Sequence, residues 1–377
     1  MTGPTVLFAG GGSGGHISPA LAIAEAVQSI DPEATCLFAC SDRPIDAAML
    51  EQAERIGYPL PARPPSLKPA RMLGFARSFS KSRRMAAELI QAREVDVTVL
   101  LGGFVAAPVA SACRRTKTPS LMVNLDRVPG RANMWIRPSA STVVSAVTTV
   151  KPFATQITGM PIRHAAMPPG TPAACRRQLG LDPDRPTLLI TGASQGAGTI
   201  NALMPYIAEQ HSAALDRWQI LHLAGPAAAD EARSAWHRSA IEATVLGFRH
   251  DMGVVWGSGD LVISRSGACS VAEIEYAGLP AIYLPYPHHR DNHQQHNAAP
   301  AVEAGAAVIV TDTTDTARTA NALLDAAGAL LAAESPLEAM QTAAAARSGR
   351  DSAGDLARLA IGLIGSQGPI VITGGGT

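Results

Sequence analysis

The chain has 377 residues, a formal net charge of zero and 16% charged residues. This length predicts two domains. The neutral balance gives no sign of a nucleic-acid partner, so contact with a membrane or an anionic ligand needs a local patch. The five cysteines are scattered and odd in number, which indicates free thiols in a reducing compartment. We expect neither a signal peptide nor a membrane-spanning run.

The chain opens with a predicted strand, a glycine loop and a helix. Residues 5–9 are apolar, residues 10–16 read GGGSGGH, and residues 19–27 have helical periodicity. Glycines let a ligand approach the backbone closely, and a helix start favours anions, so this arrangement is typical of phosphate binding. His16 follows the loop, where an imidazole can take or give a proton. The alternative is a histidine that caps the helix.

A basic and apolar segment follows a predicted strand at 34–39 and a helix at 45–56. Residues 55–87 contain eight basic side chains and no acidic one, and four large apolar side chains, Met72, Leu73, Phe75 and Phe79, lie among them. This composition predicts contact between the 63–84 region and an anionic membrane surface. The alternative is a solvated helix with one stripe facing the core.

Three further features complete the first half. A strand at 95–101 ends in Gly102-Gly103-Phe104 before a helix, and a strand at 120–123 leads into a polar turn at 124–127. A β-branched run follows at 142–150, and residues 158–163 form a crossing rich in proline and glycine. Ligands in open α/β sheets gather at the carboxyl ends of the strands, so we expect these turns to share one crevice.

The second half repeats the pattern. We predict strands at 187–191, 220–223, 243–246, 261–263, 279–284 and 306–310, and helices from 200 and at 268–277, 317–333, 336–346 and 355–364. The turns at 192–197 and 264–267 precede helices, the loop 285–297 is polar, and 367–377 forms a tail. Asp182 and Asp184 have the spacing of a metal-binding DxD motif, but Pro183 between them favours a turn.

These elements predict an α/β protein with two similar parallel-sheet halves and a ligand cleft between them.

Several motifs together resemble the MurG family of glycosyltransferases. They are GGGSGGH at 10–16 with Pro19, GGF at 102–104, GMPIR at 159–163, GASQGA at 192–197, RSGA at 265–268 with Glu273, and DNHQQ at 291–295 with Asn297. The resemblance implies a GT-B fold of two Rossmann-like domains that face a central cleft. The first is then expected at 1–162, joined by a C-terminal helix at about 347–366, and the second at 163–346. The resemblance also implies an inverting transfer of N-acetylglucosamine from UDP-N-acetylglucosamine to a lipid-linked muramyl-pentapeptide, in peptidoglycan synthesis. It implies a peripheral enzyme on the cytoplasmic face of the cell membrane, without cofactor or metal.

The resemblance also implies roles for individual residues. His16 is the expected catalytic base, with Ser13, Gly14 and Gly15 beside the donor. Ser194 and Arg163 are expected at the diphosphate or uridine, the main chain near Arg249 at the uracil, and Glu273 at the ribose. The remaining donor-binding residues are Asp126, Ala268, Cys269, Ser270, Val271, Ala272, Gln294 and Gln295, the glutamines being expected at the sugar. The expected membrane contacts are Lys68, Arg71, Phe75, Phe79 and Lys81.

One stretch departs from the family. Where MurG proteins typically carry His-Glu-Gln-Asn, this chain has Val123-Asn124-Leu125-Asp126. An aspartate accepts hydrogen bonds from a sugar but cannot donate them, and its charge repels a diphosphate. Three alternatives therefore stay open: a transferase acting on another lipid such as diacylglycerol or with another sugar, a UDP-sugar-binding protein without turnover, and a UDP-N-acetylglucosamine 2-epimerase.

Overall fold

The computed structural model describes residues 3–12, 15–64, 69–239, 241–288 and 291–365, without the side chains of 69–71 and 334. The chain divides into two compact units. Unit 1 comprises residues 1–163 and 351–377, and unit 2 comprises residues 164–350. Each is described by itself. Arg163 therefore belongs to unit 1, and the tail predicted at 367–377 lies outside the described residues.

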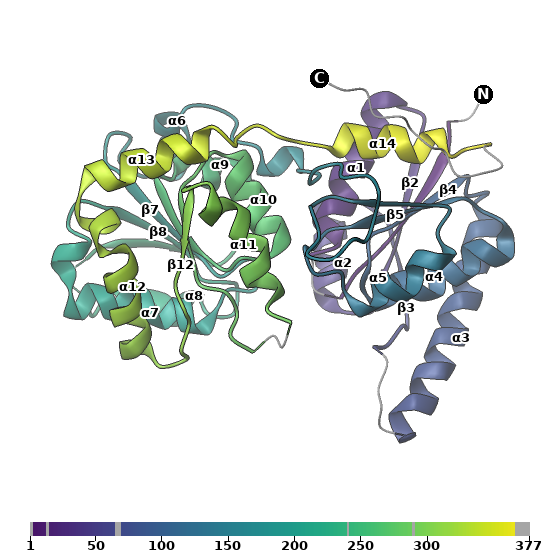
Figure 1. Ribbon diagram of the computed structural model, residues 1–377, viewed down its shortest axis with the longest axis horizontal. Coiled ribbons are helices and arrows are strands. Elements are labelled where there is room, and N and C mark those ends of the chain that lie inside the picture. Colours follow the sequence, from purple (N-terminus) through teal and green to yellow (C-terminus); the bar gives the residue numbers. More distant parts are fainter. Residues whose placement is uncertain (1–2, 13–14, 65–68, 240, 289–290, 366–377) are drawn as a thin grey trace. The chain divides into compact units, whose positions relative to one another are not determined.

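Unit 1 is built on a six-stranded parallel sheet in the order β3-β2-β1-β4-β5-β6 (Figure 1). In chain order its elements are β1 (Thr5–Ala9), α1 (Ile17–Ile30), β2 (Thr35–Ser41), α2 (Pro44–Gln52), β3 (Gly57–Leu60), α3 (Pro69–Ala92), β4 (Val97–Leu100), α4 (Gly103–Thr116), β5 (Ser120–Asn124), α5 (Arg131–Ile136), the 3-10 turn η1 (Arg137–Ser139), β6 (Thr142–Ser145) and α14 (Ala353–Gly362).

Both faces of this sheet are buried, which is why its strands are apolar throughout rather than alternating. One core layer joins the sheet to α1 and α14, and the other joins it to α3 and α4. The C-terminal helix α14 lies beside α1 (Figure 1). Two hydrogen bonds fix its entry: Oδ1 of Asp351 accepts from the Ile162 N–H at 2.9 Å, and the Met160 carbonyl accepts from the Ser352 N–H at 3.2 Å.

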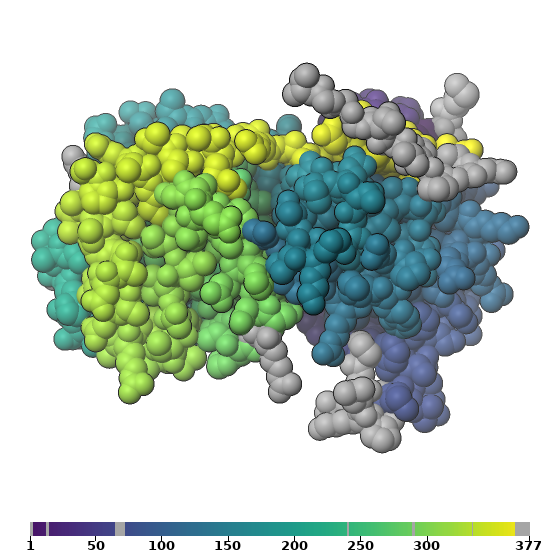
Figure 2. All heavy atoms as spheres, viewed as in Figure 1, coloured from purple at the N-terminus to yellow at the C-terminus, as the bar shows by residue number. Residues whose placement is uncertain are grey.

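Unit 2 repeats the plan with the strand order β12-β11-β10-β7-β8-β9, all parallel. Its elements are η2 (His164–Ala166), α6 (Pro172–Gln178), β7 (Thr187–Thr191), α7 (Gly198–Gln210), η3 (Ser212–Ala214), β8 (Gln219–Leu223), α8 (Ala229–Trp236), β9 (Ala243–Leu246), α9 (Met252–Ser258), β10 (Leu261–Ser264), α10 (Ala268–Tyr276), β11 (Ala281–Tyr283), α11 (His293–Glu303), β12 (Ala307–Ile309), α12 (Thr316–Ala332) and α13 (Glu334–Ala345). In Figure 2 the yellow-green atoms of α12 and α13 cover one flank of this unit.

The strand order reverses between β1 and β4 in unit 1, and between β7 and β10 in unit 2. Ligands of open parallel sheets bind at the carboxyl ends of the strands beside such a switch point. The glycine loops predicted at 10–16 and 102–104 follow β1 and β4, and the turns at 192–197 and 264–267 follow β7 and β10. The topology therefore places each predicted loop pair at a binding edge.

Some elements differ from the sequence predictions. The short strand β3 and the helix α5 were not predicted, and β6 ends at Ser145 although the β-branched run continues to 150. The polar loop expected at 285–297 instead becomes α11 from His293 onward. Asn292 is left-handed with φ 48°, and the Asp291 carboxylate accepts from the His293 N–H at 3.3 Å, which starts the helix. The helix was not predicted because its first five residues, HQQHN, are all polar. Its buried face is formed by Asn297, Ala298 and Ala301.

Two other predictions are confirmed. The Asp182–Asp184 segment is a turn ahead of β7, in which the Asp182 carboxylate accepts from the Asp184 N–H at 2.9 Å. The five cysteines are free thiols, three of them buried and two half-buried.

The core of unit 2 contains a buried histidine, His222 on β8, held neutral by its partners. Its Nδ1 accepts from the indole of Trp236 at 2.9 Å, and its Nε2 lies 3.1 Å from Oδ1 of Asn201. Burial lowers the pKa of His222 to about 4. In the unfolded chain the same ring titrates near the ordinary value of about 6.5.

Acidification therefore destabilises the fold through His222. Between pH 6.5 and pH 4 His222 is protonated in the unfolded state but not in the folded state. The free energy of unfolding therefore falls over this range, by about 3 kcal/mol in total. Urea unfolding at pH 7 and pH 4 measures this loss. The variant His222→Asn, which keeps an acceptor for Trp236 but cannot titrate, should lose about 3 kcal/mol less than the wild type. Equal losses in both proteins would contradict the assignment.

Candidate functional site

The glycine loop of unit 1 is held from beneath by a buried carboxylate. Oδ2 of Asp46 accepts from the Gly12 N–H at 2.8 Å, the Ser41 N–H at 3.1 Å and the Ser41 hydroxyl at 2.6 Å. Gly11 and Gly12 have φ of +150° and +107°, and a Cβ at Gly11 would lie 2.3 Å from Oδ2 of Asp46. Only glycine fits so close to the carboxylate.

His16 stands at the start of α1, packed among glycines. A Cβ on Gly10 would lie 2.9 Å from Cβ of His16, and one on Gly103 would lie 3.3 Å from Cε1 of its ring. Within the described residues the side chain makes no capping hydrogen bond, and Nδ1 is buried without a partner. The capping alternative from the sequence is therefore not what the structure shows.

The surroundings of His16 keep its imidazole neutral. Burial lowers its pKa below the ordinary value, while the carboxylates of Asp126 and Asp46 and the Gly11 carbonyl act in the opposite direction. Because burial dominates, the ring is uncharged at pH 7 and can accept a proton.

Asp126 follows β5 on the same edge of the sheet, close enough for its charge to act on the His16 ring. Its backbone is fixed by Asn124, which is fully buried. Asn124 donates to the Asp126 carbonyl at 2.8 Å and to the Ser145 hydroxyl at 3.0 Å, and its Oδ1 accepts from Asn133 at 3.0 Å. The departure from the MurG pattern thus puts the Asn124 amide into the sheet edge and the Asp126 carboxylate near the His16 ring.

Four other predicted donor-binding residues belong to unit 1. Ser13 and Gly14 lie outside the described residues, and Gly15 is exposed. Arg163 forms an ion pair with Glu25 on α1, with 3.5 Å between Nε and Oε1, and its side chain is 19% exposed. Within unit 1, the Arg163 guanidinium is therefore engaged by the Glu25 carboxylate.

In unit 2, two helices start beside the switch point. A Cβ on Gly196 would lie 1.9 Å from the Ala224 carbonyl oxygen, so the 192–197 turn packs directly on the turn after β8. Ser194 is half-buried in that turn. Helix α10 begins after Gly267, which has no side chain to cap it, so the first turn of α10 and the positive end of its dipole lie at this edge, where a helix favours anions.

The predicted residues of α10 split into two sets. Ala268, Cys269, Ser270 and Ala272 are half-buried, and their backbone forms the first turn at the edge. Val271 is 8% exposed and packs into the core, so only its backbone can serve a ligand. The hydroxyl of Ser266, directly before the helix, is buried without a partner in the described part of the chain.

Glu273 and Gln294 are both oriented by neighbours. Oε2 of Glu273 accepts from the indole N–H of Trp256 at 3.0 Å. Oε1 of Gln294 accepts from the Tyr286 N–H at 2.9 Å, which leaves its amide donors for another partner. Gln295 is exposed. Successive side chains on a helix diverge by about 100°, so Gln294 and Gln295 present different directions from α11.

A buried ion pair joins the loops of this edge. Arg265, after β10, lies 2.8 Å from Asp312, after β12, and both are under a tenth exposed. The guanidinium also donates to the Leu284 carbonyl at 2.7 Å and to the Thr199 hydroxyl at 2.5 Å. Sequence analysis noted Arg265 only as part of a motif and did not identify Asp312.

Arg249, expected near the uracil, is tied to its own loop. Its guanidinium donates to both carboxylate oxygens of Asp251, at 2.8 Å and 2.5 Å. Asp251 precedes α9, so this pair braces the turn between β9 and α9. The structure places Arg249 after β9, two strands from β7 in the sheet order.

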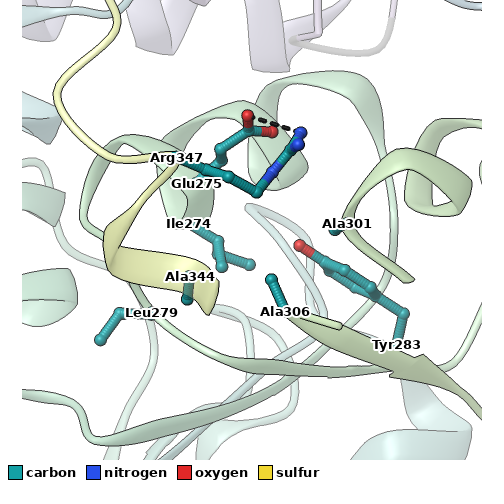
Figure 3. A pocket seen from close by; sticks show the side chains of 8 residues that line it. All are labelled: Ile274, Glu275, Leu279, Tyr283, Ala301, Ala306, Ala344 and Arg347. Atoms are coloured by element: carbon teal, nitrogen blue, oxygen red, sulfur yellow. Dashed lines mark hydrogen bonds and ion pairs between the residues drawn. The ribbon is translucent and has the colours of Figure 1, made fainter. Parts of the chain in front are cut away.

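A small pocket lies in unit 2 at the far end of α10 from its N-terminus (Figure 3). Its empty volume of about 230 Å³ includes open solvent, and small-molecule pockets are usually larger. The Tyr283 hydroxyl points into it from β11, beside an ion pair of 2.8 Å between Glu275 and Arg347. Burial raises the pKa of Tyr283, so the phenol stays neutral.

Two features are absent from the described residues. No helix among them is both long and apolar enough to cross a membrane. No group of three or more His, Cys, Asp or Glu side chains in that part of the chain could hold a metal ion.

Family models match both units. The glycosyltransferase family 28 N-terminal domain matches residues 6–145, and the family 28 C-terminal domain matches residues 187–355. Among similar curated proteins, one from Clavibacter michiganensis is 34% identical over 81% of this chain and 83% of its own length. One from Nocardioides is 33% identical over 95% and 98%. Both are named UDP-N-acetylglucosamine–N-acetylmuramyl-(pentapeptide) pyrophosphoryl-undecaprenol N-acetylglucosamine transferase.

Solved structures agree on the fold. MurG from Acinetobacter baumannii superposes with a TM-score of 0.70 at 24% identity, covering 95% of this chain and 99% of that one. A protein from Listeria monocytogenes, described as a UDP-N-acetylglucosamine 2-epimerase, gives 0.65 at 16% identity, covering 96% of each chain. The predicted class, two Rossmann-like domains of the GT-B type, is confirmed. The sequence identity to the transferases, 33–34% over most of both chains, is about twice the 16% identity to the epimerase. The chain therefore belongs to the MurG family of glycosyltransferase family 28.

Proposed function

We propose that this enzyme transfers N-acetylglucosamine from UDP-N-acetylglucosamine to undecaprenyl-pyrophosphoryl-MurNAc-pentapeptide, the step from lipid I to lipid II in peptidoglycan synthesis. The observation that carries this proposal is the identity of 33% over 95% of the chain with a transferase of that name. A neutral imidazole on unit 1 and an uncapped helix N-terminus on unit 2 supply the chemistry that such a transfer needs.

His16 is the proposed base. The acceptor hydroxyl loses its proton as it attacks the anomeric carbon, and a neutral imidazole receives that proton. The ring needs no prior deprotonation at pH 7, because burial already lowers its pKa. Attack from the face opposite the leaving group inverts the anomeric centre.

The leaving UDP develops negative charge as the bond to the sugar breaks. We assign the first turn of α10, Ala268 to Ala272, to the diphosphate, since its backbone N–H groups and helix dipole stabilise an anion. Ser194 adds a hydroxyl from the neighbouring turn. Glu273 is assigned to the ribose hydroxyls, the turn at Arg249 to the uracil, and the Gln294 and Gln295 amides to the sugar. Arg163 serves the donor only if its pair with Glu25 opens.

Asp126 departs from the MurG pattern, and this departure left another lipid acceptor open as an alternative. The test therefore compares two acceptors. The enzyme is incubated with UDP-N-acetylglucosamine and either a short-chain lipid I analogue or diacylglycerol, and products are identified by mass. The proposal expects one added N-acetylhexosamine on the lipid I analogue alone. Glycosylated diacylglycerol would instead assign the enzyme to another lipid.

We further propose that the enzyme works as a peripheral protein at the cytoplasmic face of the membrane, through α3. Phe75 and Phe79 lie with ring centroids 6.0 Å apart, and Trp135 of α5 stacks on Phe79 at 5.3 Å. Met72, Leu73, Met134 and Trp135 are all more than half exposed. Lys81, two residues after Phe79, is exposed, whereas Lys68 and the Arg71 side chain lie outside the described residues. Sequence analysis missed Met134 and Trp135, because α5 was not predicted.

Vesicle binding tests this surface. The variant Met72→Ser/Leu73→Ser removes two side chains that are 57% and 56% exposed, so folding should be unaffected. Burying each in lipid is worth about 1.5–3 kcal/mol, so we expect at least a tenfold loss of co-sedimentation with anionic vesicles. Ile56→Ser, at a position 71% exposed outside α3, is the matched control and should bind normally. Equal loss in both, or no loss in either, would contradict the membrane assignment.

A further inference from the structure

Glu273, the residue assigned above to the ribose, is held by a side chain from another helix. The indole N–H of Trp256 on α9 donates to Oε2 of Glu273 on α10 at 3.0 Å. Trp256 is 2% exposed and belongs to the core of unit 2. A buried indole cannot swing away, so its N–H is a fixed point against which the carboxylate is oriented.

The chemistry of the pair suits a ribose. A carboxylate has about four lone-pair positions on its two oxygens, and the indole N–H occupies only one of them. An acidic side chain that accepts from the ribose hydroxyls is a recurring device in nucleotide-binding α/β folds. An unrestrained glutamate loses side-chain entropy when a ligand fixes it. A glutamate already fixed by Trp256 avoids most of that loss on binding.

We propose that Trp256 is a positioning residue that sets the preference of the donor site for ribonucleotides over 2′-deoxyribonucleotides, by orienting Glu273. The inference rests on the proposed function, because it takes Glu273 as the ribose ligand. It extends that function by assigning sugar selectivity to a core residue that does not itself meet the substrate.

The experiment compares the affinities of the full chain for UDP and 2′-deoxy-UDP by calorimetry. A hydrogen bond to a charged group is worth about 1.5–3 kcal/mol, so the wild type should prefer UDP by about tenfold or more. Trp256→Phe keeps an aromatic ring and removes the N–H, and it should lower this preference at least threefold. The KM for UDP-N-acetylglucosamine should rise with little change in kcat.

The chain offers a matched control. Trp218 is also fully buried in unit 2, and its indole donates to the Leu331 carbonyl at 2.9 Å, away from Glu273. Trp218→Phe makes the same chemical change and should keep the wild-type preference. A ratio of two affinities does not depend on the folded fraction, so partial unfolding of a variant cannot imitate the effect.

Three results would overturn the inference. In the first, Trp256→Phe keeps the wild-type preference for UDP while Glu273→Gln reduces it. Glu273 would then still be the ribose ligand, but Trp256 would have no role in orienting it. A wild type that binds both nucleotides equally would remove Glu273 from the ribose. A wild type that binds neither would contradict the donor site of the proposed function as well.

Discussion

Replacing His16 by alanine should lower kcat by about 100- to 10,000-fold, the contribution of a positioned general base. The ring is neutral, stands at the switch point of unit 1 and is packed by Gly10 and Gly103, so no other side chain can take its place without rearrangement. UDP-N-acetylglucosamine affinity should change little. His211→Ala, at an exposed position after α7, is the control and should keep full activity.

The pH profile of kcat/KM gives the same prediction a second readout. Because burial lowers the pKa of His16, the acid limb should fall below pH 6.5. The Asp126 carboxylate raises that pKa, so Asp126→Asn should move the limb to still lower pH. An acid limb above pH 6.5, or a shift to higher pH in Asp126→Asn, would show that another group acts as the base.

Replacing Asp312 by alanine should destabilise the protein by about 3–5 kcal/mol, because it leaves the Arg265 guanidinium buried without its counter-ion. Asp312 is 4% exposed and lies 2.8 Å from Arg265. Burial alone raises the pKa of Asp312, yet hydrogen bonds from Thr199 and Arg265 hold it below its ordinary value. The carboxylate is therefore charged throughout the neutral range.

The matched control for this prediction is an exposed ion pair. Asp355 and Arg358 lie 2.6 Å apart on α14 with side chains 62% and 66% exposed, and pairs of this kind contribute at most about 1 kcal/mol. Chemical unfolding of Asp312→Ala and Asp355→Ala should therefore differ by at least about 2 kcal/mol. Similar losses would mean that the Arg265 pair does not brace the loops of unit 2.

The parts of the site that follow local rules were readable in the sequence. The glycine loop before α1 and the turn before α10 could be predicted, because an apolar strand, small residues and a helical spacing follow one another within a few positions. His16 and Glu273 stand at fixed offsets from those loops, so they too were identified. In these cases the chemistry and the local backbone conformation are specified by neighbouring residues.

The remainder depends on contacts between residues far apart in the chain. Asp312 meets Arg265 only because β10, β11 and β12 align their carboxyl ends, and no pattern around Asp312 indicates this. The sequence pattern shows Trp256 only as an apolar core residue. Its contact with Glu273 of α10 exists only in the folded unit. The helix α11 was hidden because its first five residues, His293 to Asn297, are all polar, so tertiary packing decided its conformation.

The central claim, that this chain is an inverting N-acetylglucosamine transferase, is tested most directly by proton NMR of one reaction. UDP-N-acetylglucosamine, in which the sugar is α-linked, is mixed with the enzyme, a water-soluble lipid I analogue and EDTA. The account predicts that the α-anomeric signal disappears as a β-linked disaccharide appears, with UDP as the only other product. An α-linked product, or the signals of UDP-N-acetylmannosamine, would contradict it.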